Sequence, residues 1–98
     1  MTDLEMTKLA AEAMGLEYQA TIQNGPSIVT TQQWVYDPLH DDAQAMALVK
    51  RFNMGWDKET ESEWHIAIRD GNMMFNAHDD NLNRAIVECV AKMQANKP

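Results

Sequence analysis

The sequence predicts an α+β fold in which three helices pack a small antiparallel sheet. Amphipathic runs near residues 4–14, 41–53 and 80–94 repeat apolar residues every three or four positions, as helices do. A further segment alternates apolar and polar residues on both sides of an Asp-Gly pair, as the two strands of a hairpin do. A chain of 98 residues buries about two thirds of its unfolded surface, so we expect residues 1–98 to form a single domain.

The first helix is expected over residues 4–14. Asp3 can accept a hydrogen bond from a free backbone N–H at its start, and Gly15 can end it in the left-handed conformation that glycine tolerates. Its apolar residues fall on one face: Met6, Leu9, Ala10 and Ala13.

Residues 17–36 allow two interpretations, a short irregular hairpin or a long ordered loop. The stretch "TIQNGPSIV" places β-branched residues on both sides of Asn24-Gly25, a common hairpin turn. Pro26 has no N–H for a strand ladder, so any strand that begins there lies at a sheet edge. Asp37-Pro38 then interrupts the chain before the second helix.

The second helix is expected over residues 41–53, with Asp41 as its cap and Gln44 at capping-box spacing. Lys50 and Arg51 lie near its negative C-terminal end. Its buried stripe is formed by Ala45, Leu48, Val49 and Phe52. The following stretch, "NMGWDKETESE", is expected to be a loop.

The clearest element is a hairpin that pairs residues 63–69 with 72–78 around a type I′ turn at Asp70-Gly71. This register places Ile66 opposite Phe75 and His65 opposite Asn76. One face is then apolar: Trp64, Ile66, Ile68, Met73, Phe75 and Ala77. The last helix, residues 80–94 capped by Asp79 or Asp80, is expected to cover it with Leu82, Ile86, Cys89, Val90 and Met93.

A repeated pattern, "HDDAQAMALV" from His40 and "HDDNLNRAIV" from His78, suggests either a metal site or two helix starts. A zinc site needs three or four converging ligands, and nothing in the spacing brings the two motifs together. Carboxylates directly before an amphipathic run are typical of helix caps. We therefore interpret the acids as caps and the histidines, including His65, as surface residues, and expect no metal.

Composition and the remaining motifs predict a protein that is not an enzyme and carries no cofactor. No nucleophile–base pair or glycine-rich phosphate loop occurs, and Cys89 lies on the inward stripe of its helix. Eight Lys and Arg against fifteen Asp and Glu, a net charge of −7, argue against binding nucleic-acid phosphates. No apolar run is long enough for a membrane span, the N-terminus is unlike a signal peptide, and a single cysteine suits a reducing cytoplasm.

Three stretches in order, "LAAEAMGLE", "WVYDPLHDDAQAMALVKRF" and "RAIVECVAKM", resemble small proteins of bacteriophages and prophages described as the phage ABA-sandwich domain. The chain departs from that pattern in Asp-Asp-Ala, where Asp-Asp-Gly is frequent, and in the insert "QATIQNGPSIVTTQQ". The resemblance implies a phage or prophage origin and the cytoplasm of a bacterial host. It brings no catalytic residues.

Two functions are consistent with these features. The first is a phage accessory protein that binds a host or phage protein, for counter-defence or as a nucleic-acid mimic. The second is a binder of a small nucleotide signal, which needs Lys50, Arg51, Arg69 and Arg84 to converge. Self-association is left open.

For the first function we expect the contact surface in loop 54–63. Trp56 is its predicted anchor, and the acids around it are Asp57, Glu59, Glu61 and Glu63. Trp34, the other tryptophan outside a periodic face, is a second candidate. The alternative for Trp56 is that it folds back onto the sheet while the acids only keep the loop hydrated.

Overall fold

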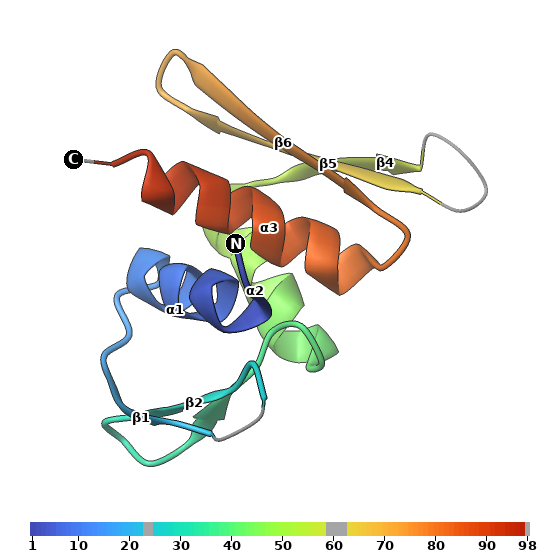
Figure 1. The fold of residues 1–98 in the computed structure, drawn as a ribbon. Helices are drawn as coiled ribbons and strands as arrows, with labels where there is room; N and C mark the ends of the chain where they lie inside the picture. Colours follow the sequence, from blue (N-terminus) through green and yellow to red (C-terminus); the bar gives the residue numbers. More distant parts are fainter. Residues whose placement is uncertain (23–24, 59–62, 98) are drawn as a thin grey trace.

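The α+β class is confirmed by the computed structural model, which describes residues 1–22, 25–58 and 63–97. Within these residues a layer of helices lies between two antiparallel sheets of three strands each (Figure 1). Sheet A contains β1 (Tyr18–Thr21), β2 (Ile28–Thr30) and β3 (Val35–Tyr36), and sheet B contains β4 (Gly55–Lys58), β5 (Trp64–Asp70) and β6 (Met73–Asp79). The helices are α1 (Asp3–Ala13), α2 (Asp42–Phe52) and α3 (Leu82–Ala95).

The core is organised around α3, which contacts α1, α2, β5 and β6. Ile86, Val87 and Val90 on this helix are fully buried. They meet Ile66 and Ile68 of β5, so the prediction that the last helix covers the hairpin's apolar face is confirmed. Both sheets therefore depend on one shared helical layer.

The helix caps differ from the predicted residues at two of the three starts. Thr2, not Asp3, accepts the Glu5 N–H at 3.1 Å, and Asn81, not Asp79 or Asp80, caps α3. Several capping residues stand side by side at each of these starts, and any of them satisfies the sequence rule.

At the end of α1 and the start of α2 the predicted residues have the predicted roles. Gly15 ends α1 with φ 73°, and the Leu16 N–H reaches Ala11 O at 2.9 Å. Asp41 caps α2 by accepting the Gln44 N–H at 3.0 Å. The expected capping box does not form, because the Gln44 amide bonds elsewhere, to the backbone N–H of Asp37.

The described part of residues 17–36 forms sheet A. The interpretation as an irregular hairpin is correct for β1 and β2, and β3 adds a third strand that neither interpretation included. β2 pairs with β1 and with β3, and Ile28, Thr30 and Tyr36 are buried. Asn24 of the proposed turn lies outside the described residues. Gln44 on α2 anchors this sheet: its side chain accepts the Asp37 N–H at 2.6 Å and donates to Val35 O at 2.9 Å.

In sheet B the hairpin is present, but its predicted register is wrong by two residues. Ile66 pairs with Ala77 and not with Phe75, because the turn residues are Gly71 and Asn72 and Asp70 pairs with Met73. Gly71 has φ 64° while Asn72 does not have positive φ, the sign pattern of a type II′ turn. A shift of two residues keeps every side chain on its face, so the predicted apolar face survives.

The stretch predicted as a loop after α2 also contains a strand. β4 pairs with β5, with Trp56 opposite Ile66 and Asp57 opposite His65. β4 is only four residues long and the sequence after it is rich in acids, so its alternation of side chains could not be recognised in the sequence.

Candidate functional site

Trp56 lies on the outer strand β4, where it is half exposed. Opposite residues of an antiparallel pair share a face, so Trp56 is on the helix-facing side with the buried Ile66. Its ring is 6.3 Å from that of Trp64, which packs against the core, and 49% of the residue is exposed. Lys58 Nζ stands 5.3 Å from the centre of the Trp64 ring. The rings of Trp56 and Trp64 thus form an apolar surface, called the Trp56 platform below, that is partly exposed.

Acidic side chains lie close to this platform in the sheet, but on the opposite, outer face of sheet B. Asp57 is exposed on the outer face of sheet B, and its carboxylate accepts the Lys58 N–H at 2.8 Å. Glu63 lies directly before β5, with its Oε1 3.4 Å from Nδ1 of His78. Glu59 and Glu61, also predicted as site residues, lie outside the described residues. The structure thus places two of the four predicted acids at the two ends of the β4–β5 connection.

The outer face of sheet B carries a row of residues that the sequence did not predict. His65 pairs with His78, not with Asn76 as the expected register required, and it also faces Asp57. The two imidazole rings stack at 4.4 Å with an angle of 7° between them. His65 Nε2 is 2.9 Å from Asn76 Oδ1. The correct turn and the β4 alternation together would have identified this row.

Trp34 is separated from the Trp56 platform. It directly precedes β3 in sheet A, and the two sheets lie on opposite sides of the helices (Figure 1). Its ring meets that of Tyr36 edge-on at 5.9 Å, and 38% of the residue is exposed. The two tryptophans that we predicted for one contact surface therefore belong to different faces of the molecule.

The four cations that a nucleotide site requires are distributed over different elements. Lys50 and Arg51 are in the last turn of α2, whereas Arg69 is on β5. Arg84, in the first turn of α3, is paired with Asp3 at 2.6 Å and with Asp79 at 3.4 Å. None of the four lines either of the two cavities described below.

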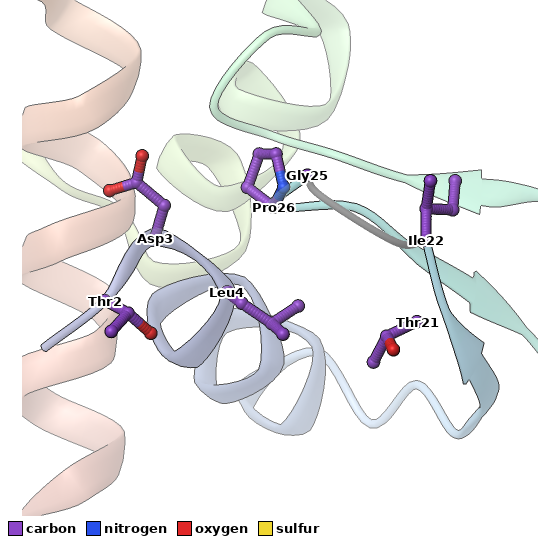
Figure 2. A pocket seen from close by; sticks show the side chains of 7 residues that line it. All are labelled: Thr2, Asp3, Leu4, Thr21, Ile22, Gly25 and Pro26. Atoms are coloured by element: carbon purple, nitrogen blue, oxygen red, sulfur yellow. The ribbon is translucent and has the colours of Figure 1, made fainter.

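A cavity of about 550 Å³ opens between the start of α1 and the end of the β1–β2 hairpin (Figure 2). Leu4 points toward Thr21, while the Asp3 carboxylate turns away from both. A second cavity of about 470 Å³ lies between the starts of α2 and α3 and is lined by Asp42 and Asp80 among others. Neither is lined by Lys or Arg, so neither suits an anionic ligand.

The described residues offer neither a reactive thiol nor a metal site. Cys89 is fully buried, and burial raises the pKa of its thiol to about 12, which disfavours the nucleophilic thiolate. Among the described residues, no group of three or more His, Cys, Asp or Glu is arranged to hold a metal ion. No helix in the same residues is long and apolar enough to cross a bilayer.

Comparisons with known proteins returned no match: no family model, curated protein or solved structure is similar to this chain. The resemblance to the phage ABA-sandwich proteins therefore stays a prediction from three sequence motifs.

Proposed function

We propose that this chain is a protein-binding accessory protein whose contact surface is the Trp56 surface, defined here as Trp56, Trp64, Asp57 and Glu63. The observation that carries the proposal is a tryptophan that is 49% exposed on an outer strand, in contact with a second indole. The two acids lie on the other face of the same sheet. Tryptophan is the residue most enriched among interface hot spots, and such residues work best when a partner removes them from water.

Charge supports a basic partner. A net charge of −7 attracts cationic surfaces, and Asp57 and Glu63 add to that field from the outer face of the sheet that carries the anchor. The net charge of the whole molecule should therefore speed association with a basic target, and burial of the Trp56 indole should raise the affinity. The distribution of Lys50, Arg51, Arg69 and Arg84 gives no comparable support to a small anionic ligand.

The resemblance to phage proteins suggests where the partner is found. A phage or prophage origin would place the protein in the cytoplasm of a bacterial host, so a host or phage protein is the expected target. Counter-defence and mimicry of nucleic acid are both consistent with an acidic binding surface.

The test begins with capture of a partner from host lysate and continues with affinity measurements on variants. Trp56→Ala should weaken binding by at least about thirtyfold, because hot-spot truncations cost about 2 kcal/mol or more. Trp34→Ala is the matched control, since it removes another partly exposed indole from the opposite sheet and should leave affinity unchanged.

The contribution of charge is measured separately with the double substitution Asp57→Asn and Glu63→Gln. It should slow association and flatten the dependence on salt, with little change in dissociation. A partner that binds the Trp56→Ala protein as tightly as the parent, or that loses affinity equally with Trp34→Ala, rules the Trp56 surface out.

A further inference from the structure

The outer strand β4 directs the backbone groups of Trp56 away from sheet B. A two-residue turn makes its flanking residues, Asp70 and Met73, a hydrogen-bonded pair between β5 and β6. Hydrogen-bonded and non-hydrogen-bonded pairs alternate along an antiparallel ladder, so the odd-numbered residues of the central strand β5 bond β4 instead. Their partners on β4 are Gly55 and Asp57. The N–H and C=O of Trp56, between these two, therefore point to the open side of the strand.

Three observations agree with this assignment. The Lys58 N–H, which has the same phase as that of Trp56, bonds the Asp57 carboxylate at 2.8 Å and not β5. All four residues of β4 are exposed. Within residues 1–22, 25–58 and 63–97, no hydrogen bond outside the ladder engages the N–H or C=O of Trp56. These two groups are free to pair with a further strand.

The two faces of β4 differ in their chemistry. The helix-facing side carries Trp56 and Lys58, and Lys58 Nζ is 5.3 Å from the centre of the Trp64 ring. The outer side carries Gly55 and the carboxylate of Asp57. Because Gly55 has no side chain, a cavity of about 170 Å³ opens there, lined by Gly55, Trp56, Asp57, His65 and Ala67. An acid beside an open space thus marks one face, and an indole beside a lysine marks the other.

We propose that the partner of the Trp56 surface binds as an extended strand that pairs with the backbone of Trp56 and adds a fourth strand to sheet B. The inference rests on the proposed function and adds the conformation and sequence pattern of the partner. In such complexes main-chain hydrogen bonds supply affinity, and alternate side chains supply specificity.

The partner strand carries an apolar side chain between two basic ones. Successive side chains of a strand point to opposite faces, so a single strand reaches both the Trp56 indole and the Asp57 carboxylate, although these lie on opposite faces. The residue that bonds the backbone of Trp56 lies beside the indole and is the apolar one. Its two neighbours lie beside Asp57 and over the cavity at Gly55. A shift of one residue would place the basic side chains beside Lys58, so charge selects the register.

The test uses three synthetic peptides of about ten residues, made of equal numbers of lysine and valine, titrated calorimetrically into the intact chain. In the first peptide the two residue types alternate, and in the second they form two blocks. The alternating peptide should bind at least about tenfold more tightly, because only alternation places valine beside Trp56 and lysine beside Asp57 together. The third peptide alternates but has N-methylated valines, and it should lose at least about tenfold in affinity because it cannot donate to the Trp56 carbonyl.

Two matched protein variants locate the charge. Asp57→Asn keeps an acceptor for the Lys58 N–H but removes the carboxylate, and it should weaken binding of the alternating peptide about threefold. Glu17→Gln removes one charge from an exposed residue directly before β1 in the opposite sheet, and it should leave that affinity unchanged. In the complex, the Trp56 amide should exchange with solvent at least about tenfold more slowly than in the free protein.

The outcomes separate this inference from the proposed function. Equal affinities of the alternating and block peptides, full affinity of the N-methylated peptide, or no binding at millimolar concentration overturns strand pairing. So does an unchanged rate of exchange at the Trp56 amide. A captured partner that loses affinity with Trp56→Ala, when the peptides show no preference for alternation, leaves the Trp56 surface in place and overturns the strand alone. A captured partner that ignores Trp56→Ala overturns both.

Discussion

At the scale of single residues, Cys89 shows how burial decides reactivity. Its sulfur has no exposed surface and donates a hydrogen bond to Phe75 O at 3.3 Å. Desolvation is the main cause of the raised thiol pKa, and the nearby Lys92 only partly offsets it.

The native protein should therefore resist alkylation. With iodoacetamide at pH 8, we expect Cys89 to react far more slowly than the same cysteine in denaturant, because the thiolate is scarce and the sulfur inaccessible. Mass spectrometry of timed samples measures the two rates. Equal rates in the native and the denatured protein would contradict the buried position.

The role of a residue could be predicted from the sequence where only one residue satisfied the physical rule in question. Cys89 lies on the inward stripe that the periodicity indicated, and Gly15 is the glycine next to the end of α1. The rule for helix caps was satisfied by several residues at the start of α3, because Asp79, Asp80 and Asn81 all have side chains that can cap a helix. Which of them caps depends on where β6 ends, and that is set by the sheet.

At the scale of elements, the hairpin turn has a direct test. Gly71 needs positive φ, and alanine there should lower the free energy of unfolding by about 1 kcal/mol. Asn72→Ala should cost less than about 0.5 kcal/mol, because position 72 does not have positive φ. Urea denaturation of the two variants measures both values.

A third variant, Asp70→Ala, distinguishes the observed turn from the predicted one. With Asp70 and Gly71 at the centre of a type I′ turn, Asp70 also needs positive φ and Asp70→Ala should be costly. In the observed turn Asp70 is a strand residue, so that substitution should be mild.

A second element-scale prediction concerns the connection between sheet A and α2. Gln44→Ala removes two hydrogen bonds to Asp37 and Val35 and should cost about 0.5–2 kcal/mol. Gln32→Ala, on an exposed turn, should change stability by less than about 0.5 kcal/mol. If both variants unfold at the same urea concentration, the Gln44 bridge contributes nothing measurable.

Helices and strands could be predicted when their own sequence was long enough to show a repeat of apolar residues. The three helices and the long hairpin each have it, whereas β1, β2, β3 and β4 are two to four residues long. Strands this short are stabilised by neighbours distant in sequence, such as the Gln44 bridge and the pairing of β4 with β5. The contact between Trp56 and Trp64 could not be predicted for the same reason, because it forms only when β4 pairs with β5.

At the scale of the whole molecule, α3 packs against sheet B and against α1, which in turn contacts β2 of sheet A. Ile86 is fully buried on α3, and Ile86→Ala should lower the free energy of unfolding by about 2–5 kcal/mol. Amide exchange at Val29 in sheet A and at Ala67 in sheet B should accelerate together. Exchange that accelerates in sheet B alone would show that sheet A is stabilised independently of α3.

The location of α3 in the chain has a consequence for biosynthesis. Asp3 and Arg84 are 81 positions apart and are joined at 2.6 Å, so the first and last helices meet only after residues 82–95 have left the ribosome. Until then the hairpin of Ile66 and Ile68 has no cover for its apolar face. Nascent chains that stall before Leu82 should consequently be recognised by chaperones and proteases as unfolded, and residues 1–81 should fold only after α3 has emerged.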